Sequence, residues 1–149
     1  MTEPKIGPLS LLHPTGSPSA KGDPWTRMSF TDLPQFDAST VLARWRRLHA
    51  GQGDFDPPPT TGLVDGWAHY HRGDFEQAAA IGLQHGGRDG LALANRSTAI
   101  YANYLEPREA VRLTLFRLVA DRAAEQAEQE PDDCQAHYWH AYALGRYSQ

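Results

Sequence analysis

Two pairs of histidines lie close enough along the chain to suggest metal binding. His69 and His71 are two residues apart, so on a helix they would point to different sides. His137 and His140 are three apart, so on a helix they would share a side and could both bind zinc. Asp133 and His69 are candidates for a third ligand, but no spacing in the sequence supplies one. We therefore expect no bound metal, and a metal-dependent enzyme using His137 and His140 remains an alternative.

Cys134 is the only cysteine of the chain, which excludes an intrachain disulfide and a cysteine-based zinc cluster. His137 would share a helix face with Cys134, and Asp133 could orient the imidazole. Cys134 is therefore a candidate nucleophile with His137 as its base. A small cysteine at the start of a helix explains the same residues. The sequence contains no phosphate loop, dinucleotide glycine fingerprint, nucleophile elbow or HExxH helix. We expect no catalysis and no cofactor.

The composition limits the classes of partner and the cellular compartment that we expect for this protein. The 149 residues suit one domain, and a net charge of −4 gives no basic excess for a nucleic-acid partner. Trp45 lies among three arginines that could contact nucleic acid, but such a run is typical of a solvated helix face. Prolines interrupt the first thirty residues, and no later window reaches the length of a membrane span. We expect a bacterial-type cytoplasmic protein without a membrane or nucleic-acid partner.

The positions of the prolines divide the chain into a proline-rich first part and a later part that can form long helices. Nine of the eleven prolines precede Leu63. Residues 1–36 are rich in Pro and Gly and are predicted to be a flexible arm. Residues 37–62 are predicted to hold a short capping helix over 38–50, begun by Asp37 or Ser39, and then a proline-rich connector at 56–59.

Beyond residue 62 the pattern changes to helices joined by short turns. Helices are predicted over 63–72, 74–85, 91–104, 107–129 and 134–147. Gly73 suits a left-handed helix end, and Asp74 with Gln77 forms a capping-box pattern. Pro107 suits a first helical turn, and Asp132 with Gln135 repeats the capping pattern. Most aromatic side chains of these helices are expected to pack between helices.

The stretch LVDGWAHYHRGDFEQA at residues 63–78 resembles the tetratricopeptide repeat (TPR). That family places a small residue, a ring, a turn glycine, an aromatic and an alanine at fixed spacings, because small residues let paired helices approach closely. The residues at those spacings here are Gly66, His69, Gly73, Phe75 and Ala78. A weaker copy uses Thr98, Tyr101 and Ala110. A third copy, with Ala141 as its small residue, is incomplete at Gln149.

The resemblance implies a fold and a function. The implied fold is all-α, with antiparallel helix pairs in a right-handed superhelix over 63–149. The implied function is non-catalytic binding of a peptide or partner protein in a groove along the first helices of successive repeats. The implied groove residues are Asp65, His69, Asn95, Arg96, Asn103, His137 and His140, with Asn95 and Asn103 favoured because carboxamides both donate and accept. A self-association module, a homodimer closed by the C-terminal helix, remains an alternative.

Overall fold

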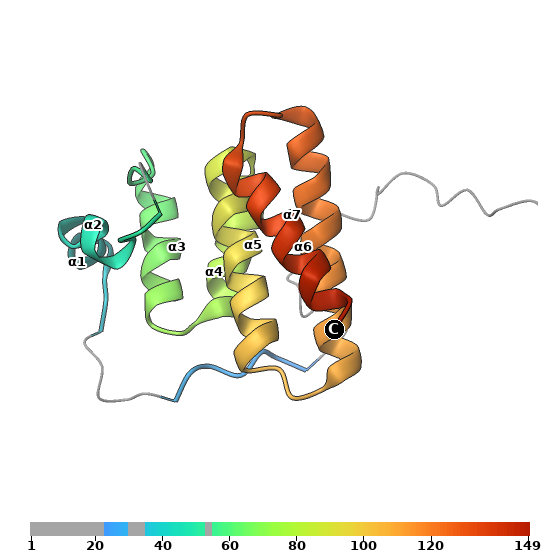
Figure 1. The fold of residues 1–149 in the computed structure, drawn as a ribbon. Coiled ribbons are helices and arrows are strands. Elements are labelled where there is room, and N and C mark those ends of the chain that lie inside the picture. The colour runs from blue at the N-terminus through green and yellow to red at the C-terminus, as the bar shows by residue number, and fades with distance from the viewer. Residues whose placement is uncertain (1–22, 30–34, 53–54) are drawn as a thin grey trace, which may run out of the picture.

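A computed structural model describes residues 23–29, 35–52 and 55–149, and the regular elements within these ranges are all helices (Figure 1). They are α1 (Ala38–Ala43), α2 (Trp45–Leu48), α3 (Thr61–His71), α4 (Phe75–His85), α5 (Gly87–Tyr104), α6 (Glu109–Gln129) and α7 (Cys134–Tyr147). The predicted all-α class is confirmed. In the same ranges, no helix is both long and apolar enough to span a membrane.

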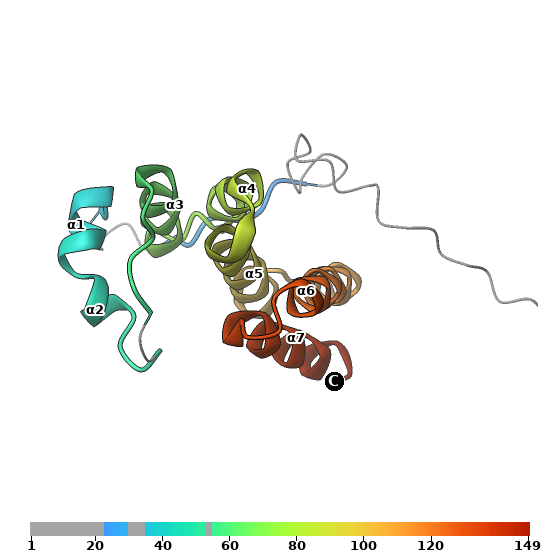
Figure 2. The same cartoon turned by 90° about the horizontal axis from the view of Figure 1, so that it is seen from above.

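Consecutive helices pack against each other from α3 to α7. In addition, α5 contacts both α3 and α7. Viewed from above, α3 to α7 follow one another as neighbours, with α1 and α2 beside α3 at one edge (Figure 2). The central position of α5 explains why it contributes more buried residues than any other helix of the described part.

The turn between α3 and α4 forms as the sequence predicts, but its cap does not. Gly73 has a φ of +75°, which only glycine adopts without strain. Asp74 is the N-cap of α4 without a side-chain capping bond, because its carboxylate pairs with His69 instead. Gly66 on α3 lies where a Cβ would collide with side-chain atoms of Leu93 and Ile81, so its small size sets the approach of α3 to α4 and α5.

Other element boundaries also differ from the predictions: α3 begins at Thr61, two residues before its predicted start. The helix expected over 38–50 is broken at Arg44, although Asp37 caps its start by accepting from the Thr40 N–H at 2.7 Å. α5 begins at Gly87 rather than near 91, because the turn after α4 needs no more than two glycines with positive φ. α6 begins at Glu109, two residues after the predicted start.

α7 keeps its predicted bounds, but the predicted cap, Asp132, is wrong by one residue. The N-cap is Asp133, whose carboxylate accepts from the Gln135 N–H at 3.0 Å. The side-chain amide of Gln126 donates to the same carboxylate, so this buried aspartate also joins the end of α6 to the start of α7.

Among the described residues, the core consists of three clusters between successive helices. One centres on Trp45, Trp67 and Leu93, one on Phe75, Tyr101 and Phe116, and one on Val119, Ala123 and Trp139. Each cluster combines large rings with alanines that are almost fully buried. Small and large side chains therefore alternate across the helix contacts, which lets the helices pack closely.

Residues 23–29 form neither helix nor strand, and Trp25 among them packs into the second cluster, whereas the sequence placed this segment in the flexible arm. Trp25 stacks on Tyr101 with ring centroids 4.3 Å apart and an interplanar angle of 6°. The backbone N–H of Trp25 donates to the Glu76 carboxylate at 3.2 Å, and Asp23 pairs with Arg108 at 2.9 Å. The rest of the predicted arm, residues 1–22 and 30–34, lies outside the described ranges.

Candidate functional site

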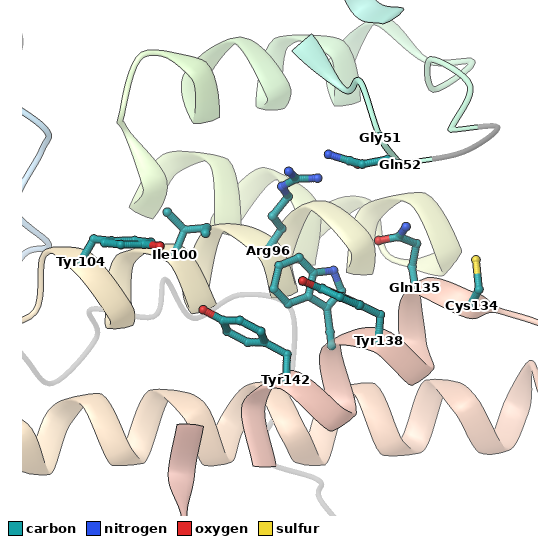
Figure 3. A pocket seen from close by; sticks show the side chains of 10 residues that line it. Gly51, Gln52, Arg96, Ile100, Tyr104, Cys134, Gln135, Tyr138 and Tyr142 are labelled. Atoms are coloured by element: carbon teal, nitrogen blue, oxygen red, sulfur yellow. The ribbon is translucent and has the colours of Figure 1, made fainter. Parts of the chain in front are cut away.

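A groove of about 510 Å³ runs between α5 and α7 (Figure 3). We call it the α5–α7 groove. Its walls are Arg96, Ile100 and Tyr104 from α5 and Tyr138, Trp139 and Tyr142 from α7. Gly51 and Gln52, in the loop after α2, and Cys134 and Gln135, at the start of α7, line it as well.

The α5 wall follows from helical spacing. Arg96, Ile100 and Tyr104 are four residues apart, so their side chains lie on one face of the helix. Leu93, one turn before Arg96, and Tyr101 are buried against the neighbouring helices. Tyr104 is 67% exposed, which is high for a ring of its size. The α5 wall therefore presents an apolar side chain and a ring to solvent.

The α7 wall is built on one buried indole. Trp139 is buried in the third core cluster. The rings of Tyr138 and Tyr142 lie edge-on to it, with centroids 4.9 Å and 5.4 Å away. Tyr138 is 55% exposed and Tyr142 is half-buried. Trp139 thus contacts two tyrosines, of which Tyr138 is the more exposed.

Arg96 extends from α5 toward Gln52 (Figure 3). Its guanidinium carbon lies 5.8 Å from the centroid of the Trp67 ring and 5.5 Å from that of Tyr70. Its Nε donates to the Tyr70 hydroxyl at 3.1 Å. Two rings of α3 therefore hold the guanidinium in place, and the energy of such cation–π contacts is about 0.5–2 kcal/mol each.

A pair of histidines supports the loop that lines one end of the groove. The Nε2 atoms of His49 and His71 are 3.4 Å apart, and the His49 ring stacks on Trp45 with centroids 4.0 Å apart. Burial lowers the pKa of His49 to about 4, with smaller contributions from the charges of His71 and Arg96. Burial and the charge of Arg96 lower the pKa of His71 to about 4 as well. Both imidazoles are therefore neutral at pH 7.

Of the residues that the sequence placed in the groove, Arg96 lines it and Asn95 does not. Asn95 is fully buried, and neither polar atom of its carboxamide has a hydrogen-bond partner among the described residues. Asn103 is half-buried on α5, outside the groove wall. The two carboxamides favoured at the sequence level are thus not brought together at the site.

The other predicted residues are dispersed. Asp65 is exposed on α3, and the Nδ1 of His69 lies 3.1 Å from the Asp74 carboxylate. His137 is exposed, and its Nε2 donates to the Pro131 carbonyl at 2.8 Å. His140 is half-buried on α7, outside the groove lining.

His137 and Asp133, which the metal and nucleophile alternatives would use, both make other hydrogen bonds in the structure. Its Nε2–H is used by the turn before α7, and the carboxylate of Asp133 is used by Gln126 and the backbone. Across residues 23–29, 35–52 and 55–149, no three His, Cys, Asp or Glu side chains come close enough to hold a metal ion. The third ligand that the zinc alternative needs is therefore missing from this part of the chain.

Comparison with known proteins identifies no family for this chain. The chain was compared with protein-family models, with curated proteins and with solved structures. No match was found. The function proposed below therefore depends on the residues of the chain itself.

The sequence did not single out Ile100, Tyr104 and Tyr138 as binding residues, although their signal was present. Ile100 and Tyr104 follow Arg96 at intervals of four, and Tyr138 precedes Tyr142 by the same interval. Once Arg96 is placed on the groove face, helical spacing brings the α5 pair with it. Which face of α5 is exposed depends on its contacts with α3 and α7.

Proposed function

We propose that the protein is a non-catalytic interaction module that binds a peptide segment of a partner protein in the α5–α7 groove. The observation that carries the proposal is that Tyr104 and Tyr138, from two different helices, line one groove and are each more than half exposed. Tyrosines offer large, rigid contact surfaces that lose little conformational entropy on binding, and they are enriched at binding hot spots.

The polar groups of the groove suit a peptide backbone. Gln52 and Gln135 line it and can each donate and accept hydrogen bonds. The indole N–H of Trp139, in the described part of the chain, is buried without a hydrogen-bond partner. A peptide carbonyl that displaced a neighbouring ring edge would accept this N–H, and satisfying such a buried donor contributes about 1–3 kcal/mol.

We further propose that α3 to α7 are TPR-like helix pairs, with α3 and α4 as the first pair, α5 and α6 as the second, and α7 opening a third. The direct contacts of α5 with α3 and α7 support this proposal, because they join the first helices of successive pairs. The groove lies on two of these first helices, where the resemblance places a bound partner. We also propose a cytoplasmic location, on composition alone.

Self-association through α7 is a second candidate. Leu144 is 45% exposed and Tyr147 is 42% exposed, and both lie on this helix outside the groove lining. Light scattering separates the two candidates, because the first expects a monomer without peptide at every concentration. A mass that rises with concentration in the wild type, but not in a Leu144→Ala variant, would favour self-association.

The test of the first candidate is a selection of random twelve-residue peptides by display against the immobilised full chain. We expect enriched peptides that bind the wild type and bind the Tyr104→Ala and Tyr138→Ala variants at least about tenfold more weakly. Both side chains are largely exposed, so these variants should keep their fold. Tyr147→Ala is the matched control, because it removes an exposed ring of α7 outside the groove.

Two results would contradict the proposal. The first is a selection that enriches no peptide over an uncoated surface. The second is a set of peptides whose affinity is the same for the wild type and for both groove variants.

A further inference from the structure

We propose that the segment bound in the α5–α7 groove is acidic: a carboxylate side chain pairs with Arg96, and a neighbouring apolar or aromatic side chain packs on Tyr104 and Tyr138. This inference rests on the proposed function and specifies the chemistry of its ligand.

Charge is the first argument. Among the described residues that line the groove, Arg96 is the only one with a charge at pH 7, and none is acidic. Ion pairs of the described part join carboxylates to Arg27, Arg88, Arg108 and Arg117, and not to Arg96. Within the described part of the chain, no carboxylate therefore pairs with Arg96.

The orientation of Arg96 is the second argument. The Nε–H is bound to Tyr70, and the only hydrogen bonds that the described residues give this guanidinium use that Nε. The two terminal nitrogens therefore remain to donate to both oxygens of one carboxylate, the geometry that an arginine fork favours. Since Trp67 and Tyr70 already hold the guanidinium, binding would cost little additional ordering of this long side chain.

The surroundings of Arg96 are the third argument. His49, which is buried, and His71, which is half-buried, lie near enough for the charge of Arg96 to lower their pKa values, and both carry no charge at pH 7. On α7, outside the groove lining, the guanidinium carbon of Arg146 lies 5.6 Å from the centroid of the Tyr142 ring. Among the described groove residues, a basic peptide would meet the like charge of Arg96, whereas an acidic peptide would meet complementary charge there.

The display selection tests this inference through the composition of the enriched peptides. In the enriched peptides we expect Asp and Glu to exceed Lys and Arg by at least about tenfold relative to the starting library. This excess should be smaller at 0.5 M NaCl than at 0.05 M NaCl. The bias should disappear with Arg96→Gln and be reduced with Arg96→Lys, which keeps the charge but not the fork. Arg112→Gln, on α6 and away from the groove, makes the same charge change as a control.

A double-mutant cycle locates the contact. The strongest acidic peptide is compared with versions in which each Glu or Asp is replaced in turn by Gln or Asn. We expect one replacement to weaken binding to the wild type at least about tenfold and to have little effect on binding to Arg96→Gln. Thermal unfolding of each variant shows whether its fold is kept.

The failures of the two proposals are distinguishable. Peptides that depend on Tyr138, yet are neutral or basic, would overturn the acidic ligand and leave the binding groove. Acidic peptides whose cycle shows no coupling to Arg96 would overturn it as well. A selection without enriched peptides would overturn both.

Discussion

The Nε of Arg96 donates a hydrogen bond to the hydroxyl of Tyr70 at 3.1 Å. This contact joins a residue that lines the groove on α5 to a ring of α3 that packs on the first and second core clusters. The orientation of the one cation among the groove residues is thus set by the same rings that hold α3 in place. The proposed site and the fold share these side chains.

Tyr70→Phe tests whether that hydroxyl prepares Arg96 for binding. The ring and its cation–π contact are kept, so we expect the free energy of unfolding to change by less than about 1.5 kcal/mol. Affinity for a selected acidic peptide should fall severalfold, because the guanidinium loses the bond that orients it. Chemical denaturation and titration calorimetry measure the two quantities. Unchanged affinity would show that the rings alone position Arg96.

Arg122 provides a prediction about stability. It is buried, its terminal nitrogen donates to Thr98 at 3.4 Å, and burial lowers its pKa to about 10. A lowered pKa means that the fold disfavours the charged form. In the described part of the chain no carboxylate pairs with Arg122, and an unpaired buried charge is costly. Arg122→Met is therefore expected to raise the free energy of unfolding by about 1–3 kcal/mol in urea denaturation.

The matched control is Arg117→Met, because Arg117 is exposed on the same helix and pairs with Asp121. Exposed pairs of this kind contribute little, so this variant should change the free energy of unfolding only slightly. A loss of more than about 1 kcal/mol on replacing Arg122 would contradict our account of its burial.

The pair of His49 and His71 predicts a loss of stability on acidification. Burial lowers the pKa of His49 and of His71 from 6.5 to about 4. Between these values the unfolded chain binds protons that the folded chain does not, so the free energy of unfolding should decrease as pH falls from about 6.5 to 4. Denaturation at pH 7.5, 5.5 and 4.5 measures this decrease.

The His49→Phe, His71→Phe double variant isolates the contribution of the pair from that of the carboxylates, which also titrate toward pH 4. Its stability should change less over the same pH range than that of the wild type. Identical pH dependence in the two proteins would show that the imidazoles are more accessible to water than the structure indicates.

Trp25 provides a test of the docked N-terminal segment. It is almost buried, and it stacks on Tyr101. Truncating a ring of this size in a core typically costs about 3–5 kcal/mol, so Trp25→Ala should cost at least about 2 kcal/mol in urea denaturation. Met28→Ala, in the same segment but 37% exposed, should cost much less. Equal, small effects would mean that the segment does not stay docked.

Local signals predicted most helices of the fold. α7 keeps its predicted bounds, and Gly73 makes the predicted turn, because a capping side chain and a positive φ act over a few residues. The missed cap of α4 has the opposite cause. Asp74 pairs with His69 and Arg27, and such a competing partner is fixed by tertiary structure rather than by the capping pattern.

The site was predicted less well because it depends on helix rotation and on distant contacts. Asn95 and Arg96 are adjacent, so they point about 100° apart around α5, and one is buried while the other lines the groove. Trp25 and its stacking partner Tyr101 are 76 residues apart in the sequence. No periodic pattern in the sequence indicates such a contact.

The affinity of a selected peptide for the wild type and for Tyr138→Ala, measured by titration calorimetry, tests the central claim most directly. Our account predicts a loss of at least about tenfold in the variant, with Tyr147→Ala within about twofold of the wild type. Equal affinity for all three proteins would contradict it, because the peptide would then bind elsewhere than in the α5–α7 groove.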